Sequence, residues 1–157
     1  AMLFIPAPDQ VWVAAMEASL QAHGIDANLI WSRDEQHGVG LLDVLPGSVN
    51  KLHALRYLIG LTGIAESRVM FAGDSGNDLP VLSSHLQSVL VANAREDVRQ
   101  QALAAAHRHG HTAALYIAQG GFMGMNGNYA AGILEGIAHY HPHTLDWMGF
   151  EDAERQA

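Results

Sequence analysis

The chain has 157 residues, of which 49% are hydrophobic, and it carries a formal net charge of −8. This composition predicts a globular protein, and the negative charge argues against nucleic acid or an anionic membrane as a partner. The absence of cysteine excludes disulfides and thiol chemistry, and no apolar run approaches the roughly 18 residues that span a bilayer.

The first part of the chain predicts a helix followed by a hairpin. The start, MLFIPAP, lacks the basic region and long apolar run of a secretory signal, so we expect a cytoplasmic location. Pro8 and Asp9 precede a helix that runs to about His23, and Gly24 ends it. Two strand candidates, 27–33 and 39–45, flank a loop of hairpin length.

From residue 48 onward, strands and helices alternate. After a helix that begins near Lys51, we expect strands at 69–72, 88–92 and 112–118, with helices near Leu79 and at 96–107 and 128–140. Such alternation predicts an α/β fold with a parallel, doubly wound sheet.

The segment 69–82, VMFAGDSGNDLPVL, carries the strongest functional signal. Its apolar start predicts a strand covered on both faces, and Asp74 lies just past it. Open α/β sheets bind ligands at the carboxyl ends of their strands. Mg²⁺ is usually held by one or two carboxylates together with water and phosphate oxygens, so Asp74 is a candidate Mg²⁺ ligand. The alternative is a simple turn in which Asp78 caps the next helix.

Lys51, the one lysine of the chain, follows the turn PGSVN at the start of a helix. Ser48 or Asn50 is the candidate cap, which places Lys51 in or beside the first helical turn. There the helix dipole disfavours a cation by about 0.3 to 1 kcal/mol. A bound phosphate reverses this effect, because both the helix start and the ammonium attract it. The alternative is a lysine that extends into solvent.

Taken together, Lys51 and the segment 73–82 resemble the third and fourth motifs of the haloacid dehalogenase superfamily of phosphatases. The resemblance is to the branch with a cap domain inserted between motifs two and three. Within it, segments 41–58, 73–82 and 128–140 are similar to sucrose-phosphate phosphatase and to the phosphatase-like domain fused to some sucrose-phosphate synthases. The resemblance implies a Rossmann-like sheet, with the C-terminal part of a cap at 1–46 and the C-terminal part of the phosphatase core at 47–157.

The resemblance also implies a Mg²⁺-dependent hydrolase of sugar phosphates, with sucrose 6-phosphate as the expected substrate. It assigns catalytic roles to Lys51, Asn77 and Asp78. Lys51 and Asn77 would contact the phosphate, whereas Asp74 and Asp78 would serve the metal.

The sequence departs from that family at one decisive point. The family's enzymes begin with a strand that ends in Asp-x-Asp, which supplies the nucleophile and the acid and base. This sequence contains no Asp-x-Asp, and the serine or threonine of motif two cannot be placed. We therefore expect the second half of a phosphatase, inactive by itself. The alternatives are a noncatalytic phosphosugar-binding or assembly domain of a sucrose-phosphate synthase, and a fragment left by truncation or proteolysis.

A missing first strand would leave one edge of the strand at 69–72 unpaired. We therefore expect a homodimer, an exchange of elements, or association with a separate N-terminal half.

Three further features admit two interpretations each. Histidines alternate at 107–111 and at 139–143. One interpretation is that they bind a metal ion, and the other is that they lie at solvated ends of helices or strands. Asn93 faces the ligand crevice or caps the next helix. The glycine-rich loop 119–128 cradles phosphate or only connects two elements.

Overall fold

The structure is a computed structural model that describes residues 2–5, 11–34, 37 and 39–149. The chain divides into two compact units, Ala1–Leu58 and Ile59–Ala157. The expected boundary between residues 46 and 47 remains a prediction. Among the described residues, no helix combines the length and the apolar character that crossing a membrane requires.

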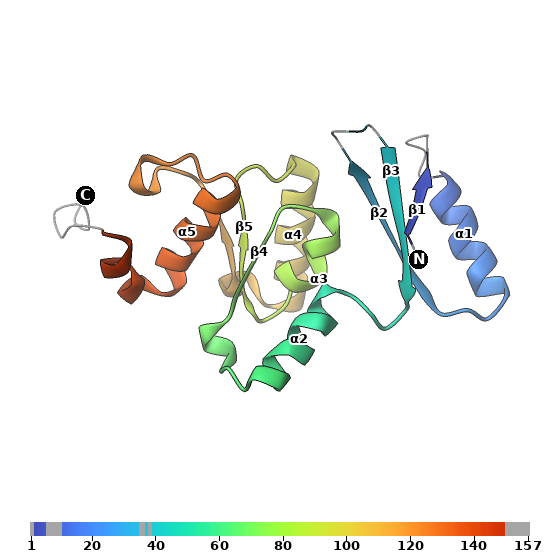
Figure 1. Ribbon diagram of the computed structural model, residues 1–157, viewed down its shortest axis with the longest axis horizontal. Helices are drawn as coiled ribbons and strands as arrows, with labels where there is room; N and C mark the ends of the chain where they lie inside the picture. Colours follow the sequence, from blue (N-terminus) through green and yellow to red (C-terminus); the bar gives the residue numbers. More distant parts are fainter. Residues whose placement is uncertain (1, 6–10, 35–36, 38, 150–157) are drawn as a thin grey trace. The chain divides into compact units, whose positions relative to one another are not determined.

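The first unit contains a small antiparallel sheet, one complete helix and the start of α2 (Lys51–Thr62) (Figure 1). The elements that lie wholly within it are β1 (Met2–Ile5), α1 (Val11–Ala22), β2 (Ala27–Asp34) and β3 (Val39–Pro46). Strands β2 and β3 form the predicted hairpin, in register from Ala27↔Pro46 to Asp34↔Val39. The predicted cap of α1 by Pro8 and Asp9 lies outside the described residues.

Strand β1 was not predicted from the sequence. It pairs antiparallel with β3, and Met2 lies opposite Asp43. The resulting strand order is β1-β3-β2. A short apolar run has no periodicity that identifies it as a strand, and its partner β3 lies far along the chain.

The second unit is built on a parallel sheet with the strand order β4-β5-β6. Helix α2 (Lys51–Thr62) spans the point at which the two units are divided. The elements that follow are β4 (Met70–Gly73), α3 (Leu79–Leu82), β5 (Gln87–Leu90), α4 (Glu96–His109), β6 (Leu115–Ile117) and α5 (Tyr129–Tyr140). The predicted alternation and the parallel α/β sheet are therefore confirmed.

Both faces of the parallel sheet are covered, as the apolar strand sequences require. Figure 1 shows α5 on one face and α3 with α4 on the other. One core cluster joins Leu90 of β5 to residues of α3 and α4, and a second contains its neighbour Val89 and is contacted by Tyr140 of α5. Because consecutive strand residues point to opposite faces, β5 contributes to both clusters.

Two strands of the second unit, β5 and β6, are shorter than predicted. Strand β5 ends at Leu90 rather than at residue 92, and β6 begins at Leu115 because residues Thr112–Ala114 form a 3₁₀ turn. Within the described residues, β4 pairs with β5 alone, so it forms one edge of this sheet. The association expected at that edge remains a prediction.

Candidate functional site

Asp74 lies directly beyond β4, and its side chain is held from the loop that follows β5. The Nδ2 atom of Asn93 donates a hydrogen bond of 3.0 Å to Oδ2 of Asp74. The two loops also meet through their backbones, because the Val91 amide donates to the Gly73 carbonyl at 3.1 Å. Parallel strands bring their carboxyl ends to one edge of the sheet, which explains how residues so far apart in sequence meet.

Asp78 is buried and fixes the backbone of the turn that carries Asp74. Its Oδ2 atom accepts hydrogen bonds of 3.0 Å from the amides of Asp74 and Ser75 and one of 2.8 Å from the Ser75 hydroxyl. A Cβ added at Gly73 would lie 2.5 Å from Cγ of Asp78, so this close approach needs glycine.

Asp78 occupies the predicted cap position of the helix that follows it, but its side chain makes no cap bond there, so whether the turn has a function as well remains a prediction. Instead, Asp78 forms a capping box with Ser75 around the short 3₁₀ helix Gly76–Asp78. Ser75 therefore belongs to the site. Its signal in the sequence was the capping-box spacing of serine and an acid three residues later.

Asn77 lies within the same turn and is partly buried. The Ser75 hydroxyl contacts Oδ1 of Asn77 at 2.7 Å as well as Oδ2 of Asp78, so its single hydrogen is shared between two acceptors. The structure thus brings Asp74, Asn77 and Asp78 together in one hydrogen-bonded turn.

Asn93 faces this turn and does not cap α4. The cap position of α4 is Arg95, which makes no side-chain cap bond. The Oδ1 atom of Asn93 accepts a hydrogen bond of 2.7 Å from the amide of Tyr129, the first residue of α5. Asn93 therefore faces Asp74 rather than capping α4, and a ligand crevice at this place remains a prediction.

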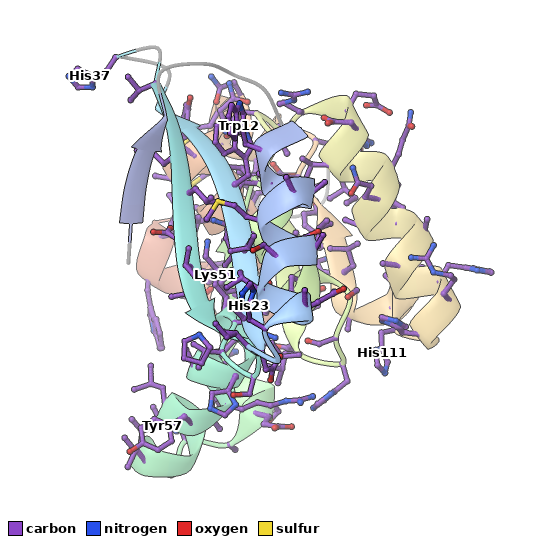
Figure 2. The ribbon with its side chains drawn as sticks, turned by 90° about the vertical axis from the view of Figure 1, so that its right-hand side faces the viewer. Trp12, His23, His37, Lys51, Tyr57 and His111 are labelled. Atoms are coloured by element: carbon purple, nitrogen blue, oxygen red, sulfur yellow. The ribbon has the colours of Figure 1, made fainter. Side chains whose placement is uncertain are left out.

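Lys51, labelled in Figure 2, is the first residue of α2, and it is exposed. Of the two candidate caps, Ser48 and Asn50, it is Asn50 whose Oδ1 accepts a hydrogen bond of 2.9 Å from the His53 amide. Lys51 belongs to the first unit and Asp74 to the second. Their convergence on one ligand remains a prediction.

The donor chemistry of the turn fits Mg²⁺. Within the part of the chain that the structure describes, no donor contacts Oδ1 of Asp74. No group of three or more His, Asp or Glu side chains that would hold a metal occurs among the described residues. One or two carboxylates suit Mg²⁺, which usually keeps several waters and substrate oxygens as ligands.

Three of the alternating histidines make contacts within the second unit. The Nδ1 atoms of His109 and His111 lie 3.1 and 3.0 Å from the Ser83 carbonyl oxygen. The His139 ring stacks on Tyr116 at a centroid distance of 4.2 Å. These contacts tie the histidines to the surface of the second unit.

The start of the glycine-rich loop 119–128 is occupied by a protein carboxylate. Glu135, which is 6% exposed, accepts hydrogen bonds of 2.8 and 2.9 Å from the amides of Gln119 and Gly120. These two amides are therefore not available to cradle phosphate. Sequence reasoning missed Glu135, although a lone charge within the apolar helix 128–140 was a visible signal.

Tyr116 completes the Glu135 cluster and makes it sensitive to alkaline pH. Its hydroxyl donates to Oε1 of Glu135 at 2.7 Å. Burial, and after it the hydrogen bond to Glu135, raises the pKa of Tyr116 from 10.0 to about 12. Because the folded state holds this proton more tightly, the resulting stability is present below pH 10 and is lost as the pH rises towards 12.

We expect the Tyr116→Phe variant to lose less stability than the wild type between these two pH values. Urea unfolding at a series of pH values would measure the difference. Phenolate absorbance of the folded proteins would show that the variant lacks a late-titrating tyrosine. Equal pH dependence of stability in the two proteins would contradict the assignment. Tyr140, whose pKa burial also raises, is present in both and serves as an internal reference.

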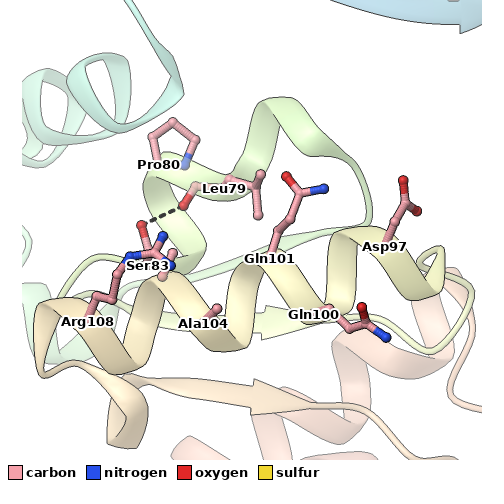
Figure 3. Close-up of a pocket in the computed structure, with 9 residues that line it drawn as sticks. Leu79, Pro80, Ser83, Asp97, Gln100, Gln101, Ala104 and Arg108 are labelled. Carbon is pink, nitrogen blue, oxygen red and sulfur yellow. Dashed lines mark hydrogen bonds between the residues drawn. The ribbon is translucent and has the colours of Figure 1, made fainter.

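A surface pocket of about 560 Å³ lies between α3 and α4 (Figure 3). Its lining residues are Leu79, Pro80, Ser83, Asp97, Gln100, Gln101, Ala104, Ala105 and Arg108. The Ser83 hydroxyl there donates to the Leu79 carbonyl at 2.8 Å. Neither Asp74 nor Asn93 is among the residues that line this pocket.

Comparison with known proteins gives concordant matches. The family model described as sucrose-6F-phosphate phosphohydrolase matches residues 4–141. A relative from Nitrosococcus oceani, described as a HAD-like hydrolase, is 51% identical over 144 residues, which are 90% of this chain and 38% of the relative. The mannosylfructose-phosphate phosphatase of Agrobacterium fabrum is 28% identical over 87% of this chain and 48% of its own length.

A solved structure matches as well. The sucrose-phosphatase of Synechocystis, in complex with sucrose and phosphate, superimposes with a TM-score of 0.62 and 25% identity. The match covers 86% of this chain and 48% of that chain. This chain therefore spans about half or less of the length of the relatives that it matches.

Proposed function

Because this chain belongs to the sucrose-6F-phosphate phosphohydrolase family, we propose that it supplies the phosphate- and Mg²⁺-binding part of a sugar-phosphate phosphatase. The observation that carries the proposal is the position of the Asp74 carboxylate just after β4. Asn93 donates a hydrogen bond to this carboxylate, and Asp78 accepts one from the Asp74 amide. Sucrose 6-phosphate is the proposed substrate, because the matching solved enzyme is a sucrose-phosphatase with bound sucrose and phosphate.

We assign each predicted site residue a separate task. Asp74 would bind Mg²⁺, and Lys51 would contact the phosphate as a movable point charge. Asn77, whose Oδ1 accepts from Ser75, would donate to the phosphate through Nδ2. Asp78 would support the metal shell, since its Oδ2 engages the amides of Asp74 and Ser75. Bound Mg²⁺ would offset the negative charge of the phosphate and of Asp74.

The nucleophile is proposed to come from residues outside these 157. The sequence has no Asp-x-Asp, and β4 has an edge to which a further strand can pair. A strand paired at that edge would bring its carboxyl end, and a nucleophile there, near the Asp74 carboxylate that would hold Mg²⁺. Association with an N-terminal half, or formation of a homodimer, remains the proposed route to a complete site.

A noncatalytic phosphosugar-binding or assembly domain, as in a sucrose-phosphate synthase, is the second candidate. The absence of Asp-x-Asp favours it for this chain taken alone. Both candidates require phosphosugar binding, and only the first requires turnover.

Binding and turnover of sucrose 6-phosphate by the purified chain in Mg²⁺ would test the proposal. We expect Lys51→Ala to weaken binding about tenfold or more, because a charge-assisted hydrogen bond contributes roughly 1.5 to 3 kcal/mol. Arg56→Ala removes the same charge from the exposed surface of the same helix and should leave binding unchanged. Binding without phosphate release would favour the second candidate. No binding at millimolar ligand would contradict both.

A further inference from the structure

Asn93 is the side chain through which three loops of the second unit meet. It receives the Tyr129 amide on Oδ1 at 2.7 Å and donates from Nδ2 to Asp74 at 3.0 Å. The two partners fix the orientation of the amide group, because a backbone N–H requires the oxygen and a carboxylate requires the nitrogen. A rotation of the side-chain amide that exchanges Oδ1 and Nδ2 would therefore lose both hydrogen bonds.

The backbone that carries Asn93 is itself held on both sides. The Val91 amide donates to the Gly73 carbonyl at 3.1 Å, and the Ala92 amide donates to the Gly127 carbonyl at 2.9 Å. Asn93 is partly buried between these contacts. Its position is therefore set by the sheet and by the glycine-rich loop, and it has little freedom to follow a moving Asp74.

Tyr129 supplies a second observation. Its φ of +46° is a left-handed conformation that bulky residues rarely adopt. Backbone outliers of this kind persist only where the surrounding structure fixes them, and they gather at functional sites. Here the fixing contact that the structure shows is the hydrogen bond from the Tyr129 amide to Asn93.

We propose that Asn93 is a positioning residue that holds one oxygen of the Asp74 carboxylate so that the other faces a cation. The proposal rests on the proposed function. Asn93 occupies Oδ2 of Asp74, whereas no donor from the described residues contacts Oδ1. Partners that orient a metal ligand without touching the metal usually change metal affinity by about 10- to 100-fold when they are replaced. Asn93 fits this role from a loop that the predicted motifs did not include.

Mn²⁺ binding to the purified chain, followed by electron paramagnetic resonance, would test the proposal without a need for turnover. Asn93→Leu is similar in size and lacks both the donor and the acceptor. We expect it to weaken Mn²⁺ binding about tenfold or more. Thermal unfolding without metal would show whether the variant remains folded.

Asn126→Leu is the matched control. Asn126 also accepts a backbone hydrogen bond near the start of α5, from the Asn128 amide at 3.0 Å. If Asn93 merely braced this region, both variants should weaken Mn²⁺ binding alike. We expect the Asn126→Leu chain to retain wild-type affinity for Mn²⁺.

The Asp74→Ala variant distinguishes failure of the positioning role of Asn93 from failure of the proposed metal site. If Asp74→Ala abolishes Mn²⁺ binding while Asn93→Leu leaves it unchanged, the positioning role is wrong and the proposed function stands. If Asp74→Ala has no effect on Mn²⁺ binding, the proposed metal site fails and the positioning role fails with it.

A measurement on the wild type keeps the proposal testable should Asn93→Leu not fold. The side-chain amide resonances of Asn93 are expected to shift when Mg²⁺ is added, because its partner carboxylate becomes a metal ligand. Resonances that do not move at saturating Mg²⁺ would overturn the proposal.

Discussion

Replacing Asp78 with alanine is expected to lower the free energy of unfolding of the second unit by about 3 kcal/mol or more. The substitution removes the acceptor of two backbone amides and one hydroxyl in a turn where Asp78 is 2% exposed. Each buried donor left without a partner costs roughly 1 to 3 kcal/mol. Urea unfolding would measure the loss.

Asp97→Ala is the control for this prediction. Asp97 pairs with Arg95 on the surface, with side chains 54% and 79% exposed, and such pairs contribute about 0 to 1 kcal/mol. Asp78→Asn keeps the volume and one acceptor oxygen, so it should cost less than Asp78→Ala. Equal losses from Asp78→Ala and Asp97→Ala would show that the buried turn does not depend on the carboxylate.

The second large effect is expected where α5 packs on the sheet. A Cβ at Gly136 would fall against Cγ2 of Val89, which is fully buried in β5. We expect Gly136→Ala to lower the free energy of unfolding by about 2 kcal/mol, because overpacking outweighs the better helix propensity of alanine.

Gly60→Ala makes the same chemical change on α2, where a Cβ meets nothing within 4 Å. Helix propensity then acts alone, and we expect a gain of about 0.5 to 1 kcal/mol. Thermal unfolding of the two variants should therefore show shifts of opposite sign. A gain in both would mean that α5 does not approach β5 as closely as described.

Local pattern was sufficient to predict most elements of the second unit and the place of Asp74. An apolar run followed by glycine and a polar turn identifies the end of a buried strand, and a parallel sheet brings such ends to a common edge. The resemblance to a phosphatase family then named Asn77 and Asp78. Both lie in the same hydrogen-bonded turn as Asp74.

Contacts over long sequence separations were not predictable in this way. Asn93 meets Asp74 across 19 residues and Tyr129 across 36, and only the fold decides between a crevice contact and a helix cap. Glu135 likewise finds its donors at Gln119 and Gly120 through the packing of α5. Helix and strand periodicity report which face of an element is buried, but not which partner a polar group finds.

The affinity for inorganic phosphate, measured by calorimetry across a range of Mg²⁺ concentrations, tests most directly whether Asp74 and Lys51 serve one ligand. If they do, Mg²⁺ should raise the phosphate affinity of the wild type, because linked ligands strengthen each other reciprocally. Asp74→Ala should abolish this dependence on Mg²⁺, and Lys51→Ala should weaken phosphate binding at every Mg²⁺ concentration. A wild-type affinity that does not respond to Mg²⁺, or that both substitutions leave unchanged, would contradict the shared site.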